Sequence, residues 1–340
     1  MSSPESGSQG STTPTSNAGL PASYGSLIPD PGQIWAYQWG LATGQAIALS
    51  YSFPGATATW ASDYSELNEK ATYSALDTTE MAAVRSALEA WSSVANISFT
   101  EVADTATDVG QFRFAWTQSV NGGATAWAYF PSNYSASGGD VWLSTPNMGA
   151  SRGVVSEWLP GGNAHETLLH EIGHALGLKH PFEGILNLPP AENSQKYTVM
   201  SYTNHPSSLF LNVTTPETVP EFDYTTIRPD TLMLYDILAA QYLYGANLSH
   251  HAGEDVYSFD PATPFIRTIW DGGGTDTLSV SNFSIACTIN LTPGTFSKIA
   301  IPSDPIPQGW SVDPLPTYDG TNNLAIAFNC WIENAVGGSG

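Results

Sequence analysis

Residues 165–181, HETLLHEIGHALGLKHP, contain four of the seven histidines of this 340-residue chain. His170 and His174 are four positions apart, so on a helix they project about 40° apart around the axis and one turn from each other. That spacing suits two ligands of one zinc ion, with Glu171 beside the metal and not bound to it. The stretch therefore predicts a metal-binding helix over residues 164–178.

A third nitrogen follows the predicted helix. Gly177 can adopt the left-handed conformation that ends a helix, and the turn that results lets His180 swing back toward the metal. Three protein ligands leave a fourth position for water, which is typical of a catalytic zinc site. Zinc would lower the pKa of its bound water toward about 7 and polarise the scissile carbonyl, while Glu171 takes the proton as general base. His165 lies about 140° around the helix from His170, which predicts a place at the surface or behind the ligands.

A methionine-containing segment, YTVMSY (197–202), follows the histidine motif. The pattern HExxHxxGxxH with such a turn resembles the metzincin zinc proteases, and within that clan the chain is most similar to the serralysins, the bacterial RTX-type metalloproteases. Other similar stretches are residues 83–102, 235–247, 269–281 and 331–340.

The resemblance implies a role for each matching residue. Zinc would be held by His170, His174 and His180, with Glu171 as the general base. Met200 would form the apolar floor beneath the metal, and Tyr202 would be a switchable zinc ligand that stabilises the tetrahedral intermediate. An edge strand over residues 124–130 would bind extended peptide by β-addition, through Ala126, Trp127, Ala128 and Tyr129.

The rest of the chain predicts an α+β fold in three parts. Residues 1–33 are rich in Ser, Gly, Pro and Thr, which predicts a disordered leader or short pro-segment. Residues 34–248 are expected to form the metzincin catalytic domain, a mixed twisted sheet with long helices. One helix begins at an Asp77–Glu80 capping box and carries an apolar stripe; another spans 231–244. The expected strands are 46–53, 97–102, 112–117, 124–130 and 140–143.

Residues 249–340 predict the start of an all-β, calcium-binding parallel β-roll, apparently truncated. DGGGTDTL (271–278) partly fits the GGxGxDxU calcium repeat, and residues 337–340, GGSG, match the first positions of another. Short strands are expected at 268–269, 278–280 and 288–291. Cys287 and Cys330 could form a disulfide. The resemblance implies calcium ligands from the side chains of Asp255, Asp271, Asp276 and Glu333 and from the carbonyls of Gly253 and Gly273.

Composition narrows the choice of partners. The chain has 31 acidic and 9 basic residues, a formal net charge of −22, which argues against nucleic-acid binding. An apolar run long enough to span a membrane is not found in the sequence. Together with these exclusions, the resemblance to the serralysins implies a secreted, monomeric, zinc-dependent endopeptidase of broad specificity that acts on protein or peptide substrates. Its cofactors would be catalytic Zn²⁺ and structural Ca²⁺, and its export would follow a type I-like route.

Two alternatives remain open at this point. The chain could be a non-catalytic calcium-binding adhesion or carrier module with a structural or inactive zinc site, in which a fourth protein ligand closes the metal. It could also be a protease of another metzincin branch, such as the astacins, although the calcium-repeat fragments after residue 270 argue against this.

Overall fold

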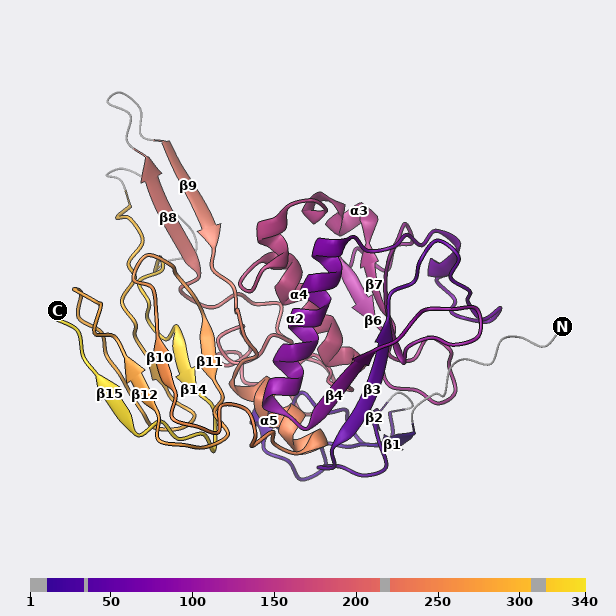
Figure 1. Ribbon diagram of the computed structural model, residues 1–340, viewed down its shortest axis with the longest axis horizontal. Coiled ribbons are helices and arrows are strands. Elements are labelled where there is room, and N and C mark those ends of the chain that lie inside the picture. The colour runs from indigo at the N-terminus through magenta and orange to yellow at the C-terminus, as the bar shows by residue number, and fades with distance from the viewer. Residues whose placement is uncertain (1–10, 34–35, 215–220, 307–315) are drawn as a thin grey trace. The chain divides into compact units, whose positions relative to one another are not determined.

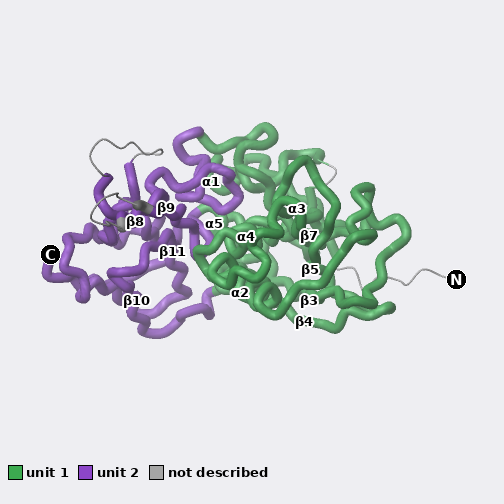
Figure 2. Tube along the Cα trace, turned by 90° about the horizontal axis from the view of Figure 1, so that it is seen from above, with its two compact units in different colours: residues 1–189, 235–247 green, residues 190–234, 248–340 purple. Residues whose placement is uncertain are grey.

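The computed structural model describes residues 11–33, 36–214, 221–306 and 316–340 (Figure 1). Its chain divides into two compact units, coloured separately in Figure 2. Unit 1 is made of residues 1–189 and 235–247, and unit 2 of residues 190–234 and 248–340. Segment 190–234, which the sequence assigned to the catalytic domain, thus groups with the C-terminal residues.

Unit 1 is built on a five-stranded sheet with the order β4-β3-β5-β7-β6. Four strands are parallel, and β6 is an antiparallel strand at one edge. Strands β5 and β7 are buried along their whole length, as expected for inner strands covered on both faces. The predicted mixed sheet is confirmed. Its strands are β3 (Ile47–Ser52), β4 (Ile97–Glu101), β5 (Phe112–Thr117), β6 (Ala126–Ala128) and β7 (Val141–Ser144).

Two long helices, α2 (Thr78–Val94) and α4 (Asn163–Ala175), lie side by side next to this sheet (Figure 1). Helix α2 begins with the predicted capping box, in which Asp77 accepts from the Glu80 backbone N–H at 2.9 Å and Glu80 accepts from the Asp77 N–H at 2.8 Å. The indole N–H of Trp91, in the buried stripe of α2, donates to the Leu169 carbonyl of α4 at 3.2 Å. The apolar stripe therefore packs α2 against the metal-binding helix.

The remaining helices of unit 1 are shorter. Helix α5 (Leu234–Tyr244) agrees with the helix expected over residues 231–244. Its residues from Tyr235 onward belong to unit 1, and Leu234 belongs to unit 2. The others are α1 (Ala22–Gly25), α3 (Thr145–Met148) and the 3₁₀ turns η1 (Glu69–Ala71), η2 (Gly149–Ser151) and η3 (Val155–Trp158).

The N-terminal segment is folded from residue 11 to residue 33, which differs from the disorder expected for residues 1–33. Strand β1 (Thr12–Pro14) pairs antiparallel with β2 (Tyr37–Trp39). Leu27 and Ile28 are completely buried, and Asn17 donates to Asp30 at 2.7 Å. The burial of two apolar residues and this hydrogen bond therefore stabilise a segment whose composition is mostly polar. Residues 1–10 lie outside the described part of the chain.

Unit 2 contains a hairpin and two small sheets. The hairpin joins β8 (Leu209–Thr214) to β9 (Glu221–Thr226). One sheet has the order β10-β12-β15 and is parallel; the other has the order β11-β14-β13, with β11 and β14 parallel. From β10 to β13 the chain alternates between the two sheets, β14 stays in the second sheet beside β13, and β15 returns to the first, which is the winding of the start of a parallel β-roll. These strands are β10 (Val256–Ser258), β11 (Arg267–Ile269), β12 (Thr277–Ser279), β13 (Phe296–Ser297), β14 (Leu324–Ile326) and β15 (Asn334–Val336).

Two further expectations for unit 2 can be compared with the structure. In place of the strand expected at 288–291, Thr288 forms an isolated bridge with Lys298. Cys287 and Cys330 are both free thiols, so the disulfide considered from the sequence is not formed. Within the described ranges, none of the helices combines the length and apolar character needed to cross a membrane.

Candidate active site

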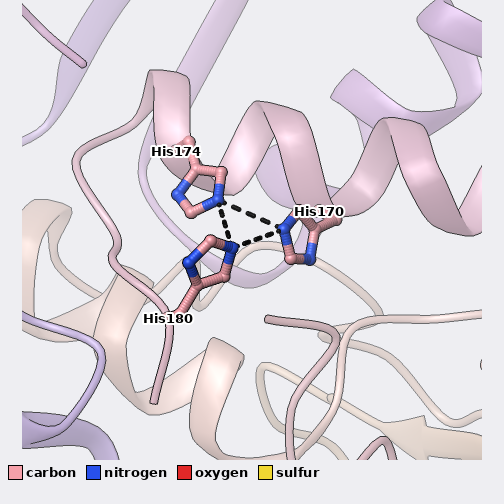
Figure 3. A group of neighbouring side chains, drawn as sticks. All are labelled: His170, His174 and His180. Atoms are coloured by element: carbon pink, nitrogen blue, oxygen red, sulfur yellow. Dashed lines mark hydrogen bonds between the residues drawn. The ribbon is translucent and has the colours of Figure 1, made fainter. Parts of the chain in front are cut away.

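Three imidazole rings converge at the end of α4 (Figure 3). His170 and His174 come from the helix and His180 from the turn after it. The Nε2 atoms lie 3.1 Å apart for His170 and His174, 3.1 Å for His170 and His180, and 3.0 Å for His174 and His180. The predicted histidine triad is thus assembled in the structure.

The return of His180 depends on how α4 ends. Gly177 has φ +106°, its N–H donates to the His174 carbonyl, and the Leu178 N–H donates to the Gly173 carbonyl. These two bonds make a Schellman motif, which reverses the chain direction after a helix. A Cβ at Gly177 would also lie 2.6 Å from the Tyr37 carbonyl oxygen. Glycine is therefore required here both by the backbone conformation and by the space available.

The ring nitrogens facing away from the triad show that zinc fits this donor set. His174 Nδ1 lies 2.7 Å from the Leu178 carbonyl oxygen, and His180 Nδ1 lies 2.8 Å from Glu183 Oε1. Because these oxygens only accept, each Nδ1 carries the proton and each Nε2 presents a lone pair to the triad. Converging lone pairs suit a cation, and nitrogens bound to tetrahedral zinc at about 2.0–2.1 Å would lie about 3.3 Å apart.

Burial keeps the central imidazole neutral. Desolvation, aided by the charges of His170 and His180, lowers the pKa of His174 well below its ordinary value. A neutral imidazole is the form that binds a metal.

Two residues near His180 were not predicted from the sequence. Glu183 accepts from His180 Nδ1, and the Phe182 ring stacks on the His180 ring with centroids 5.0 Å apart and planes 7° apart. A carboxylate that orients a ligating histidine is a common support of zinc sites. Glu183 lies three residues after His180, the last histidine of the motif, and this spacing is the signal that could have indicated its role.

Glu171 lies on α4 between the first two histidines and is buried. Its carboxylate accepts from the Ala128 backbone N–H of β6, and within the described part of the chain its Oε2 atom has no hydrogen-bond partner. Burial, reinforced by the neighbouring charge of Glu166, raises the pKa of Glu171 to about 8, against the lowering effect of the Ala128 N–H. The group is thus held at one point and offers a second, unpartnered acceptor.

Two of the predicted substrate-binding residues in and next to the edge strand β6 contact a buried carboxylate. The side chains of Trp127 and Tyr129 point to a buried carboxylate, Glu69, whose Oε1 accepts from the Trp127 indole at 3.0 Å and from the Tyr129 hydroxyl at 2.5 Å. These two side chains are thus occupied elsewhere, and the Tyr129 N–H donates to the Asp140 carbonyl, so the contribution of Trp127 and Tyr129 to substrate binding stays a prediction. Glu69 was not found from the sequence, since it lies 58 residues before Trp127.

His165 corrects one part of the sequence interpretation. It is almost completely buried, with Nε2 3.3 Å from the Ser86 hydroxyl of α2, so the suggested surface position is wrong. The ring belongs to the packing between α2 and α4.

Met200 and Tyr202 belong to unit 2. Met200 is completely buried in a turn, where its N–H donates to the Thr198 hydroxyl at 3.0 Å, whereas Tyr202 is 68% exposed. The turn is therefore confirmed as a local structure, and the roles of both residues at the zinc site stay predictions.

The predicted calcium ligands cluster within unit 2. Carboxylate oxygens of Asp255, Asp271 and Asp276 all lie within 4.8 Å of one another. Asp276 accepts from the Asp255 N–H at 2.8 Å, and Glu333 accepts from the Asp276 N–H at 2.8 Å. Asp255, Asp276 and Glu333 directly precede the paired strands β10, β12 and β15, so the register of the sheet aligns them.

Two observations bear on whether a cation fits this cluster. Asp276 Oδ2 is buried and has no hydrogen-bond partner among the residues described. A Cβ placed on Gly274 would lie 1.6 Å from the Gly253 carbonyl oxygen and 3.1 Å from Asp276 Oδ1, so this carbonyl lies beside the cluster. Carboxylate and carbonyl oxygens in this number suit Ca²⁺. Gly273, whose carbonyl is a predicted calcium ligand, donates its N–H to Asp271 Oδ1 at 2.8 Å.

A triad on a helix and its following turn, beside a mixed sheet with an antiparallel edge strand, defines a metzincin-type fold. Comparison with known proteins agrees with this class. A family model for matrixins matches residues 60–185, and one for the C-terminal part of M10 serralysins matches residues 235–301. The chain belongs to the serralysin-type metzincins.

Individual relatives are similar over most of the chain. It is 32% identical to a serralysin of Proteus mirabilis over 87% of this chain and 59% of that protein. It is 29% identical to serralysin G of Dickeya chrysanthemi, over 87% and 58%, and 32% identical to metallopeptidase AprA of Pseudomonas marginalis, over 75% and 51%. The chain therefore spans between half and three fifths of the length of these relatives.

Proposed function

We propose that this protein is a zinc-dependent endopeptidase that hydrolyses peptide bonds in proteins. The observation that carries the proposal is the convergence of three Nε2 atoms within 3.1 Å, on the same helix as a buried Glu171 that has an unpartnered oxygen. His170, His174 and His180 would hold the zinc. Bound zinc supplies a Lewis acid that polarises the scissile carbonyl and lowers the pKa of water in its open position.

Glu171 would act as general base and then as general acid. In the ionised form, which a neighbouring zinc cation would favour, its Oε2 atom is free to take the proton of the attacking water, and the same proton can pass to the amine that leaves. The Ala128 N–H would fix the orientation of the carboxylate throughout. The surrounding burial excludes competing solvent from this transfer.

A peptide substrate would add to the free edge of β6. Thr125 and Tyr129 direct their backbone groups toward β7 and the residues beside it, because the Thr125 carbonyl accepts from Ser144 and the Tyr129 N–H donates to Asp140. By alternation the backbone groups of Ala126 and Ala128 point to the open edge. The Ala126 groups and the Ala128 carbonyl would then pair with extended peptide.

For Met200 and Tyr202 we propose the roles that the resemblance to the serralysins implies. A completely buried methionine suits an apolar floor, and an exposed tyrosine hydroxyl suits a movable donor that stabilises the oxyanion.

In unit 2, calcium would be held by carboxylate and carbonyl oxygens. The carboxylates would come from Asp255, Asp271, Asp276 and Glu333, and the carbonyls from Gly253 and Gly273. We also propose that the protein acts outside the cell as a monomer, where calcium concentrations suit sites of modest affinity.

Replacing Glu171 tests the proposed activity. We expect Glu171→Gln to reduce hydrolysis of casein by about 10²–10⁴-fold, the contribution usual for a general base, while zinc content stays near one per chain. Glu66→Gln, at an exposed position, is the matched control and should keep full activity. Zinc binding without hydrolysis of any protein substrate by the wild type would favour the non-catalytic alternative and refute the proposal.

A further inference from the structure

The loop that carries the third histidine has little regular structure of its own. Residues 179–187 form no helix or strand, yet His180 must stay within 3.1 Å of both helical histidines. Inside the loop, Glu183 holds His180 Nδ1 at 2.8 Å. The precision of the site therefore depends on what holds Glu183 and its neighbours.

Asp30, from the N-terminal segment, binds the backbone of this loop. The residue is buried, and its Oδ2 accepts from the Ile185 N–H at 2.7 Å and its Oδ1 from the Leu186 N–H at 3.4 Å. Asn17 donates to Asp30 Oδ1 at 2.7 Å and fixes the carboxylate from the other side. Gly184 has φ +80°, and a Cβ there would lie 1.8 Å from Asp30 Oδ2, so the loop backbone runs directly against the carboxylate.

Lys179 ties the start of the loop to the same segment. Its N–H donates to the Leu27 carbonyl at 2.7 Å. Its buried ammonium group donates to the carbonyls of Glu183 and of Leu186, the latter at 3.1 Å. Both ends of the loop are thus bound to residues 27–30.

We propose that Asp30 is a positioning residue for the zinc site. Through Ile185 and Leu186 it fixes the loop, the loop fixes Glu183, and Glu183 orients His180. The N-terminal segment 17–30 then supports the third ligand. The inference rests on the proposed function only in assigning zinc to the histidine triad.

The test measures zinc retention by the full chain, not activity. Asp30→Asn keeps the size of the side chain but replaces one acceptor oxygen with an amide that cannot accept. We expect zinc to transfer to a chromogenic chelator about 10-fold faster or more, the loss usual when a residue supporting a ligand is changed. The cobalt-substituted variant should show an altered visible spectrum. Asp63→Asn, at an exposed position, is the control and should match the wild type.

A purely structural role for Asp30 would give a different result. It would lower the melting temperature of the zinc-free protein while leaving the cobalt spectrum and the zinc release rate within about twofold of the wild type, and this would overturn the proposal. If Asp30→Asn does not fold, Asn17→Ala replaces it, with faster zinc release expected and unchanged release refuting the proposal.

Amide hydrogen exchange distinguishes a failure of the positioning role from a failure of the proposed function. In the zinc-free protein, the amides of Ile185 and Leu186 should exchange faster in Asp30→Asn than in the wild type, whether or not the enzyme is active. Unchanged protection would overturn the positioning role. Absence of zinc binding by the wild type would instead refute the proposed function.

Discussion

His165 is a buried imidazole on the metal-binding helix that does not itself join the triad. Its ring packs toward Ser86 of α2, and its Nδ1 atom has no hydrogen-bond partner within the described ranges. Burial lowers the pKa of His165 from 6.5 to about 4. The folded protein therefore holds this ring neutral over a pH range in which the unfolded chain would protonate it.

The free energy of unfolding should therefore depend on pH through His165. Between pH 6.5 and 4 the unfolded state binds more protons, so the free energy of unfolding falls on acidification, by at most about 3 kcal/mol, and is unaffected by this group above pH 6.5. We expect His165→Gln to lose less stability between these pH values than the wild type. Urea unfolding of both zinc-free proteins at pH 7 and pH 4.5 measures the difference; equal losses would contradict it.

At the scale of residues, sequence reasoning succeeded where partners are close along the chain. The spacing of His170 and His174 and the bend at Gly177 are local, so helix geometry alone predicts the triad. Glu69 and Asp30 could not be found this way, because they meet Trp127 and Ile185 across 58 and 155 residues. Only the folded chain brings a buried carboxylate to such distant partners.

The end of α4 is the element on which the site depends most. The helix was expected to reach Leu178 but ends at Ala175, because Gly177 already has a positive φ. Its last carbonyls are satisfied by tertiary donors, since Trp39 Nε1 donates to Ala175 at 2.8 Å and the Tyr244 hydroxyl donates to Leu176 at 2.5 Å. The observed end thus lies three residues before the predicted one, at the turn that Gly177 makes.

Gly177→Ala should therefore damage both stability and metal binding. The strain of a positive φ and the approach to the Tyr37 carbonyl oxygen should together cost about 1–3 kcal/mol in the free energy of unfolding. Zinc affinity should fall as well, because His180 follows the strained turn. Gly55→Ala is the control, since Gly55 has no heavy atom within 4 Å of the added Cβ. Urea unfolding and zinc titration would contradict the account if the two variants behaved alike.

At the scale of the whole molecule, the main feature is a net charge of −22. An acidic surface of this size disfavours the compact state by self-repulsion and attracts cations without specificity. The aligned carboxylates of the roll add a specific site, in which one buried oxygen of Asp276 has no partner among the described residues. The two effects can be separated by experiment.

Calcium should stabilise the protein through the roll. At a calcium concentration about 100 times the dissociation constant, specific binding adds about 2.7 kcal/mol to the free energy of unfolding. We expect calcium chloride added to the calcium-free, zinc-loaded protein to raise the melting temperature, and Asp276→Asn to lose most of that increase. Sodium chloride at equal ionic strength is the control. Equal effects of calcium on wild type and Asp276→Asn would indicate screening of the surface charge instead.

The class of fold was predictable at this scale because the pattern of short strands, Gly-rich turns and two long helices is distributed along the chain. The grouping of residues 190–234 with unit 2 was not predictable. That grouping arises from hydrogen bonds such as Val213 N–H to Asp304 and Tyr318 N–H to the Leu209 carbonyl, which join segments about 90 to 110 residues apart.

The central claim is that three imidazoles hold a zinc ion with a position left for solvent. Anomalous diffraction at the zinc edge from zinc-loaded crystals tests it most directly. We predict one strong peak bonded to the Nε2 atoms of His170, His174 and His180 at about 2.0–2.1 Å, with water or an exchangeable group completing the coordination. A peak that excludes His180, or a metal closed by a fourth side chain that inhibitors cannot displace, would contradict the account.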